Sequence, residues 1–380
     1  MDDNTKLESL DADRPAADLP TAPPLPPPAV PGPLPNLIPG AASLQPDQEE
    51  FESPDGDGDG DGDSDRDSAY GESLHASDTA SITSAITKYR YENGRRYHAY
   101  RDGAYWAPND EIHNDQQDMA HHLWLLTLDN KLYLAPILNP QNILDIGTGT
   151  GIWAIDIADA FPSAVVRGID LSPIQPGWVP PNCLFEVDDV TLPWTFPPES
   201  FDFIHIREMF GSIGDWDKLF SEAYHALKPG AFLECAEHSV TPVSDDGTVG
   251  LDHVFTRYGA IMNDLGRKRG KEFDVWVTIK ERMKRAGFVD VIETRTKWPM
   301  NGWSPDPKMR ELGRWNQLRI TQGIEGFAMR MLTTFGGWTP LEVQIFASQI
   351  KTALKDRSVH GYLDATVVFG RKPQLSEGEL

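Results

Sequence analysis

From residue 141 onward, short apolar runs alternate with stretches of helical periodicity. The apolar runs predict strands over 142–146, 164–171, 183–187, 201–206 and 231–237. Between them, helical spacing predicts helices over 151–160 and 215–227, the second ending at Lys228-Pro229-Gly230. This rhythm is typical of an α/β fold, in which a mostly parallel sheet carries helices on both faces.

The pattern continues to the C-terminal end with longer helical segments. It predicts helices near 251–265, 273–286, 306–322 and 339–355, and two further strands over 288–296 and 362–369. The sheet then has seven strands, with a helical insertion before the last. Residues 87–140 form a lead-in, in which Trp124, Leu125, Leu128 and Leu132 recur at helical spacing.

Charge divides the chain near residue 86. The whole chain has 34 Lys and Arg against 58 Asp and Glu, a net charge of −24, and residues 1–86 account for −16 of it. That segment is proline-rich over 15–39 and lacks tryptophan, so it predicts a disordered tail. Its Asp-Gly run at 55–65 resembles a calcium loop, but no register supplies both the glycine at position 6 and the acid at position 12. We interpret it as a self-repelling spacer.

Composition excludes several classes of protein. A strongly acidic chain is a poor direct binder of nucleic acid, and without an apolar run of about 18 residues no membrane span is expected. The N-terminus lacks the features of a secretory signal. Cys183 and Cys235 allow no disulfide framework, and no cysteine–histidine cluster suggests a metal site. We therefore expect an intracellular protein, cytoplasmic or nuclear, without a bound metal.

A glycine loop joins the first strand of the sheet to the following helix. Its sequence is Asp145-Ile146-Gly147-Thr148-Gly149-Thr150-Gly151, a context typical of a nucleotide-type cofactor site. A dinucleotide fingerprint would have its third glycine at Ile152. Asp145 would repel a pyrophosphate but attract an ammonium or a sulfonium, so S-adenosylmethionine fits the loop better than NAD.

Acidic residues also end the next two strands. Asp170, followed by Leu171, is placed to accept hydrogen bonds from ribose hydroxyls; its alternative is a turn or cap residue. Asp188 or Asp189 could accept the adenine amino group, and the following Leu-Pro-Trp favours Asp188. For this pair the alternative is a solvated loop acid.

These residues resemble a known family. The segment from Leu144 to Asp156 resembles motif I of class I S-adenosylmethionine-dependent methyltransferases. Longer strings look like the fungal LaeA-like methyltransferases over nearly the whole body of the chain, from about residue 88 to 373. They are Tyr91-Glu92-Asn93-Gly94-Arg95-Arg96-Tyr97-His98, Pro108-Asn109-Asp110-Glu111, Asp170-Leu171-Ser172-Pro173 and Gly313-Arg314-Trp315.

The resemblance implies a Rossmann-like, seven-stranded methyltransferase fold whose last strand is antiparallel. It divides residues 87–380 into a helical lead-in (87–140), a cofactor-binding core (141–240) and a substrate cap with the final strands (241–373). It also implies S-adenosylmethionine over Gly147–Gly151 and on Asp170. The sequence departs from the family pattern at His113-Asn114-Asp115-Gln116-Gln117-Asp118, which bears on how the lead-in meets the cofactor.

Catalytic candidates follow the fourth and fifth strands, where open α/β sheets bind ligands. They are His205, Arg207, Glu208, Glu234, Glu237 and His238. Glu237 with His238 is the favoured acid–base pair, Arg207 is a weaker candidate for catalysis or for cofactor binding, and His205 is more typical of a core residue. Tyr105, with Tyr97 and Trp106, either closes over the cofactor or packs in the core.

Two further features have alternative interpretations. Trp298, Trp303, Trp315 and Trp338 lie in the insertion, where they line an acceptor pocket or form the core of the cap. The basic cluster at residues 267–271 is a weak nuclear-import signal or a solvated helix end.

The favoured function is methyl transfer to an oxygen or nitrogen of a small molecule of fungal secondary metabolism. The alternative is a nuclear regulator of secondary metabolism and development that acts through velvet-type partners, with the acidic, proline-rich tail as a protein-binding arm. A dehydrogenase is disfavoured by Ile152 and Asp145.

Overall fold

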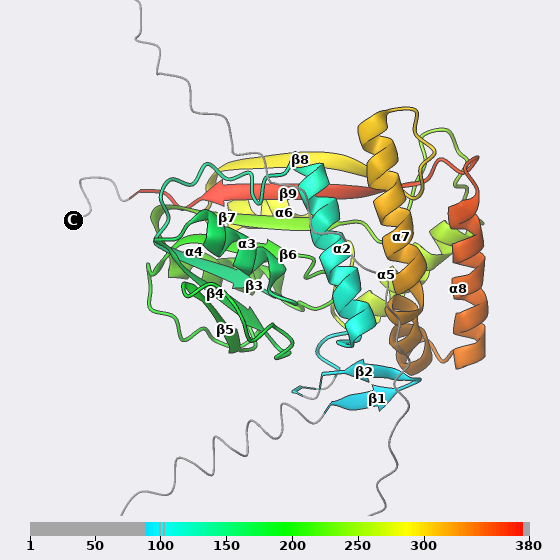
Figure 1. Ribbon diagram of the computed structural model, residues 1–380, viewed down its shortest axis with the longest axis horizontal. Coiled ribbons are helices and arrows are strands. Elements are labelled where there is room, and N and C mark those ends of the chain that lie inside the picture. Colours follow the sequence, from blue (N-terminus) through cyan, green and yellow to red (C-terminus); the bar gives the residue numbers. More distant parts are fainter. Residues whose placement is uncertain (1–88, 99, 102, 375–380) are drawn as a thin grey trace, which may run out of the picture. The chain divides into compact units, whose positions relative to one another are not determined.

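A seven-stranded sheet organises the molecule (Figure 1). The computed structural model describes residues 89–98, 100–101 and 103–374. Strand order is β5-β4-β3-β6-β7-β9-β8, and β9 runs antiparallel to both of its neighbours while the other pairs are parallel. The strands are β3 (Asn142–Ile146), β4 (Val165–Asp170), β5 (Cys183–Val187), β6 (Phe201–Arg207), β7 (Leu227–His238), β8 (Val289–Pro299) and β9 (Tyr362–Arg371). The predicted fold class is confirmed.

Helices cover both faces of this sheet because its central strands are apolar on both sides. Ile143 and Phe203 pack under α3, and Leu144 and Ile204 pack under α4. The helices are α2 (Glu111–Thr127), α3 (Ile152–Ala160), α4 (Trp216–Ala226), α5 (Val254–Lys268), α6 (Ile279–Arg285), α7 (Pro307–Arg330) and α8 (Pro340–Lys355), with a 3₁₀ turn η1 (Val275–Val277) and a π turn η2 (Met331–Phe335).

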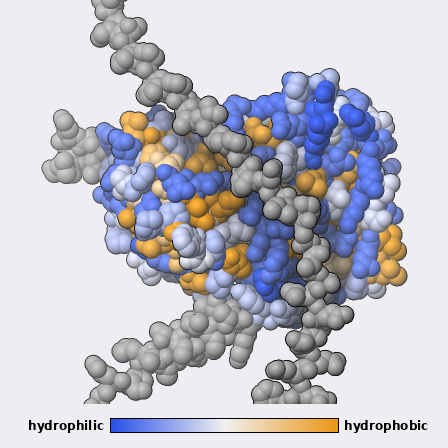
Figure 2. Space-filling model, viewed as in Figure 1, coloured by the Kyte–Doolittle hydropathy of each residue, from blue (hydrophilic) through white to orange (hydrophobic). Residues whose placement is uncertain are grey.

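The helices α2, α7 and α8 stand side by side at one end of the sheet (Figure 1). α7 and α8 form the predicted insertion between β8 and β9. In the view of Figure 2 their outward faces are mainly hydrophilic, so their apolar faces turn inward. The amide of Gln116 on α2 donates to the carbonyl of Arg319 on α7 at 3.2 Å, which fixes the lead-in against the insertion.

The lead-in begins with a hairpin that the apolar pattern does not predict. β1 (Arg90–Glu92) and β2 (Arg95–Tyr97) pair across Asn93-Gly94, whose φ angles of 49° and 75° suit a tight hairpin turn. Each strand has three residues, too few for periodicity to appear. Arg95 then makes two hydrogen bonds, of 2.6 and 2.7 Å, to the carboxylate of Asp110. Asp110 also caps α2, which fixes where that helix starts.

The lead-in helix lies earlier in the sequence than predicted. α2 ends at Thr127, Leu128 is its C-cap, and Leu132 lies beyond it. Asp129 and Asn130 adopt positive φ angles of 54° and 62°, which end the helix before the apolar repeat does.

The fifth strand and the basic cluster also differ from expectation. β7 starts at Leu227 rather than near 231, because the backbone stays extended through Lys228-Pro229 and turns at Gly230 (φ 83°). In the basic cluster, Arg269 donates to the carbonyl of Gly103 at 2.8 Å and Lys271 donates to that of Ala104. Part of this cluster therefore holds the lead-in rather than facing solvent.

The four tryptophans predicted for the insertion pack in the core and not around a pocket, and the placement of Trp298 was wrong, because it belongs to β8. Trp298 is fully buried and donates to Thr127 at 2.8 Å, and Trp303 donates to the carbonyl of Gly361 at 3.0 Å. Trp315 lies against His122, and Trp338 against Phe346. None of the four lines the large cavity described below.

Gly313 sets how closely α7 approaches the end of β8. A Cβ there would lie 2.1 Å from the carbonyl oxygen of Asn301, a backbone atom that cannot swing away. We expect Gly313→Ala to lower the free energy of unfolding by about 1–3 kcal/mol, the usual cost of overpacking, measured by urea denaturation. Gly177→Ala is the control, because a Cβ at Gly177 meets nothing within 4 Å. Equal stability of the two variants would contradict this account.

Candidate active site

A cavity of about 510 Å³ opens at the carboxyl ends of β3, β4, β6 and β7. Polar groups line one part: the backbone of Gly147–Thr150 and the side chains of Asp170, Asp188, Asn109 and Gln117. Apolar side chains from the cap line another part, among them Phe255, Met300, Ile320, Ile324, Phe327, Ile350 and Leu363. The cavity therefore joins a polar region at the glycine loop to an apolar region under α5, α7 and α8.

The glycine loop turns in a conformation that side chains rarely allow. Gly147 and Gly149 have φ angles of 70° and 58°, and a Cβ on Gly149 would lie 2.5 Å from Oε1 of Gln117. That same Oε1 accepts the Thr150 N–H at 3.1 Å, and Asp118 accepts the Thr150 hydroxyl at 2.8 Å. The lead-in helix thus reaches the loop through Gln117 and Asp118, in the segment where the sequence departs from its family pattern.

Asp145 supports the loop from behind. Its carboxylate accepts the Thr148 hydroxyl at 2.6 Å and Nδ1–H of His205 at 2.7 Å, and it is 3% exposed. His205 is buried and stacks on Trp153 at 3.7 Å, the arrangement of a core histidine. Asp145 does not line the cavity, and neither does Gly151, whose Cβ position faces Phe185.

Asp170 lies at the end of β4 and lines the cavity together with Leu171. Its carboxylate accepts N–H groups from Gly149 at 3.0 Å and from Ser172 at 2.9 Å. Burial raises the pKa of Asp170, and these two amide hydrogen bonds oppose the rise. Each oxygen keeps a further lone pair with which it can accept a ligand hydroxyl.

The structure distinguishes Asp188 from Asp189. Asp189 is buried, accepts both the N–H and the hydroxyl of Thr191, and pairs with Arg101 at 2.8 Å. Asp188 lines the cavity too, but among the described residues its carboxylate accepts a single hydrogen bond, from the amide of Asp189. Asp188 therefore has the greater free capacity for an adenine amino group.

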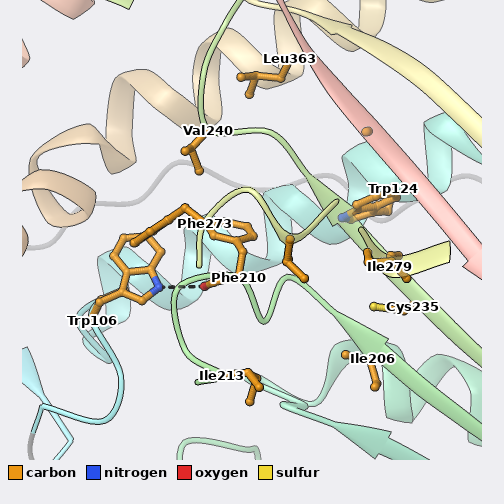
Figure 3. Packing of buried hydrophobic residues seen from close by; sticks show 14 of the residues in the cluster. Trp106, Trp124, Ile206, Phe210, Ile213, Cys235, Val240, Phe273, Ile279 and Leu363 are labelled. Carbon is orange, nitrogen blue, oxygen red and sulfur yellow. Dashed lines mark hydrogen bonds between the residues drawn. The ribbon is translucent and has the colours of Figure 1, made fainter. Parts of the chain in front are cut away.

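Tyr105 and Arg207 both line the cavity. The Tyr105 hydroxyl lies 3.2 Å from Nε2 of His113, and burial raises the pKa of this phenol. Trp106, the next residue, donates its indole N–H to the carbonyl of Phe210, which ties the lead-in to the segment after β6 (Figure 3). Arg207 donates to Nδ1 of His121 at 3.1 Å.

The residues of the favoured acid–base pair lie in different surroundings. Glu237 is fully buried outside the cavity lining, where it accepts the backbone N–H groups of Met209 and Phe210 at 2.7 and 3.3 Å. Burial holds its pKa well above the usual range. His238 lines the cavity; its Nδ1 donates to the carbonyl of Ser239, and burial with the nearby Arg319 lowers its pKa to about 4.

Sequence reasoning missed Arg319. This residue of α7 is 4% exposed, lines the cavity, and donates to Nε2 of His238 at 3.2 Å. It also faces Glu208 at 3.5 Å, whose other oxygen accepts the indole N–H of Trp124 at 2.8 Å. The available signal was an arginine directly before the apolar pair Ile320 and Ile324. Glu234, another candidate, lies away from the cavity and accepts the amides of Leu134 and Ala135.

Comparisons with known proteins agree with this geometry. A family model described as a methyltransferase domain matches residues 119–293. The chain is 39% identical over 302 residues to methyltransferase pytC of Aspergillus terreus, covering 78% of this chain and 92% of that protein. It is 35% identical to the secondary metabolism regulator LAE1 of Cochliobolus heterostrophus, covering 74% and 94%.

Among solved structures, a phosphoethanolamine N-methyltransferase of Haemonchus contortus is 19% identical, with a TM-score of 0.43 and coverage of 79% of this chain and 75% of that one.

The sheet order, the antiparallel β9 and the glycine loop after β3 define a class I S-adenosylmethionine-dependent methyltransferase. Within that class, the chain belongs to the fungal LaeA-like methyltransferase family.

The cavity fits the cofactor of this class. The glycine loop leaves its backbone open to a ligand, Asp170 retains lone pairs for hydroxyls, and Oδ1 of Asn109 is buried without a partner. Among the described residues, no group of three or more His, Cys, Asp or Glu could hold a metal, and none of the helices there is long and apolar enough to cross a membrane.

Asp170→Asn should weaken S-adenosylhomocysteine binding about 10- to 150-fold, because a hydrogen bond to a charged group contributes about 1.5–3 kcal/mol. Isothermal titration calorimetry measures this directly. Asp189→Asn, which alters a carboxylate already engaged by Arg101 and Thr191, should lose several-fold less affinity. Equal losses at the two positions would contradict the assignment of Asp170 as the ribose ligand.

Buried histidines should make the fold acid-sensitive. Burial lowers the pKa of both His113 and His238 to about 4, against about 6.5 in an unfolded chain. Between these values the unfolded chain binds more protons, so the stability is present at pH 7 and is lost as pH falls from about 6.5 towards 4. We expect each of the two histidines to lower the free energy of unfolding by roughly 2 kcal/mol when the pH falls to about 5.

Urea unfolding at about pH 7 and about pH 5 measures this loss. The double variant His113→Gln, His238→Gln should show a smaller difference between the two pH values. A difference as large as that of the native chain would assign the acid sensitivity to other groups.

Proposed function

We propose that this protein transfers the methyl group of S-adenosylmethionine to an oxygen or nitrogen atom of a small, largely apolar molecule in fungal secondary metabolism. The observation that carries the proposal is the continuity of the cavity. From Gly147 and Asp170 it runs into a region lined by Phe255, Ile324 and Leu363 of the cap. Such a region suits a compact acceptor with much apolar surface.

In this proposal, the residues around the glycine loop hold the cofactor. Gly147–Thr150 would hold its methionine part, Asp170 its ribose, and Asp188 its adenine. When bound, the cofactor supplies an activated methyl group on a sulfonium. The protein's part is to align the acceptor and to exclude water, because the displacement must be in line and its charge disperses as it proceeds.

The favoured catalytic residues take positioning roles in this scheme. Glu237 orients the backbone of Met209 and Phe210, beside the glycine loop, through two hydrogen bonds. His238 stays neutral near pH 7, and its Nε2 lone pair accepts from Arg319. A pKa near 4 makes it a weak base, so we assign it to orienting Arg319. Arg207 remains a candidate for either the cofactor or the acceptor.

The test uses the full chain with S-adenosylmethionine labelled in its methyl group and an organic extract of the source fungus. We expect the label to enter the organic-soluble fraction. Ile324→Phe, which fills the apolar region from α7, should reduce this transfer by tenfold or more and leave S-adenosylhomocysteine affinity within about twofold. Leu318→Phe is the matched control, because Leu318 is on the same helix but 43% exposed.

The same labelled cofactor, added with a protein extract of the fungus beside the organic extract, tests the regulator alternative. One relative, 31% identical over 77% of this chain, is named protein-methionine methyltransferase laeA of Emericella nidulans. Label that enters precipitated protein, and not the organic fraction, would favour an action on protein and contradict the small-molecule proposal.

A protein partner for the acidic, proline-rich tail remains a prediction, because residues 1–86 lie outside the described part of the chain. A location in the cytoplasm or nucleus is also part of this proposal. The two free, buried thiols of Cys183 and Cys235 support it, since free cysteines are typical of reducing compartments.

A further inference from the structure

Arg319 is a buried cation whose hydrogen bonds are incomplete. Its guanidinium packs 5.5 Å from the ring of Trp298, on the wall of the cavity that the cap supplies. One terminal nitrogen donates to Nε2 of His238, and Nε is buried without a partner. Buried polar groups nearly always have partners, and a buried cation is costly without them. A buried cation with so few partners that also lines the cavity points to a ligand.

The neighbouring carboxylate satisfies Arg319 only in part. Glu208 lies 3.5 Å from the guanidinium, whereas a charge-assisted hydrogen bond is usually about 2.7–2.9 Å. Its other oxygen is taken by Trp124. Arg207 and Arg319 both act on this one carboxylate, and although burial opposes it, they help to hold the pKa of Glu208 below its usual range. Among the described residues Glu208 is the one carboxylate paired with Arg319, whereas Arg207 also lies in the field of Asp145 and Asp156.

The other side-chain hydrogen-bond partners of these two arginines, among the described residues, are histidine rings. His238 donates from Nδ1 to Ser239 and accepts from Arg319 on Nε2, so it is a neutral imidazole. His121, which accepts from Arg207, likewise uses a nitrogen lone pair. The remaining acids of the cavity, Asp170, Asp188 and Asp189, belong to the polar region around the glycine loop.

We propose that Arg319 binds the methyl acceptor, and that the acceptor presents an anionic oxygen, as a phenolate, enolate or carboxylate. This inference rests on the proposed function and specifies its substrate class. An amine acceptor fits the site poorly, because its methylation leaves a cation beside a buried guanidinium. An oxyanion supplies the charge that Glu208 provides only in part.

The chemistry balances without a catalytic base. Methyl transfer to an oxyanion forms one O–C bond and breaks one C–S bond, whose electron pair stays on sulfur. The negative charge of the acceptor and the positive charge of the sulfonium cancel, so the products are a neutral ether or ester and a thioether. No proton leaves in that step, since the acceptor lost it before or on binding. This agrees with the positions of the two residues: His238, which lines the cavity, is a weak base, and Glu237 lies outside the lining, where it accepts backbone amides.

The test compares two probes of one shape and different charge, 2-naphthoate and 2-naphthamide. Each is titrated into the full chain saturated with S-adenosylhomocysteine. We expect the native protein to bind the anion at least about tenfold more tightly than the amide. Arg319→Gln should reduce this preference to less than about threefold. Glu208→Gln should raise the affinity for the anion several-fold, because it removes the competing carboxylate; a purely structural ion pair would not have this effect.

The affinity for S-adenosylhomocysteine, measured on each variant, reports whether the fold is intact. Should Arg319→Gln fail to fold because Glu208 is left unpaired, the double variant Glu208→Gln, Arg319→Gln replaces it, since that variant leaves neither charge buried. Equal binding of the two probes, binding of neither at millimolar concentration, or a preference that survives the loss of Arg319 would overturn the inference. Failure of the native chain to bind S-adenosylhomocysteine would instead overturn the proposed function.

Discussion

The hydrogen bond between Asp145 and Thr148 holds the turn on which the cavity depends. It joins the last part of β3 to the glycine loop at 2.6 Å, and His205 occupies the other oxygen of the same carboxylate. Because Thr148 is fixed from behind, the backbone from Gly147 to Thr150 faces the cavity instead of closing on itself. The stack of His205 on Trp153 then connects this loop to α3. The charge of Asp145 is thus used inside the protein, behind the loop.

A buried carboxylate also fixes the backbone of the segment after β6. Glu237 on β7 accepts the amides of Met209 and Phe210, and Met209 packs against the position where a Cβ of Gly147 would be. Glu208, just before this segment, has a positive φ of 53°, a strained conformation for a residue with a side chain. Its contacts to Trp124 and Arg319 hold it there. The strained backbone of Glu208 therefore directs its carboxylate towards the cap.

The sequence predicts the sheet well because its strands are short apolar runs between clear turn signals. The observed β3 and β5 coincide with their predicted ranges. Asp170 and Asp188 lie at strand ends, and parallel strands bring such ends together, so their approach to the cavity follows from topology. Glu237 and His238 show the limit of this reasoning. Adjacent residues of a strand point to opposite sides, and the side that faces the cavity depends on β9 and on the segment after β6.

Arg319 shows a second limit, because its partners are about 80 to 200 residues away in the chain. They are His238 on β7, Glu208 after β6, and Gln116 of α2, whose side-chain amide donates to the Arg319 carbonyl. No local periodicity encodes such a meeting, and only the packing of α7 on α2 and on the end of β8 creates it.

The two ends of the cavity are built from different parts of the chain. The core strands supply the residues around the glycine loop, whereas the cap helices supply the apolar wall and Arg319. Substitutions in α7 can therefore change which acceptor binds without changing the loop that would hold the cofactor. A family built on this plan can retain one methyl donor while its insertion changes the charge and shape presented to the acceptor. In this chain, that insertion contributes the buried guanidinium of Arg319 to the cavity wall.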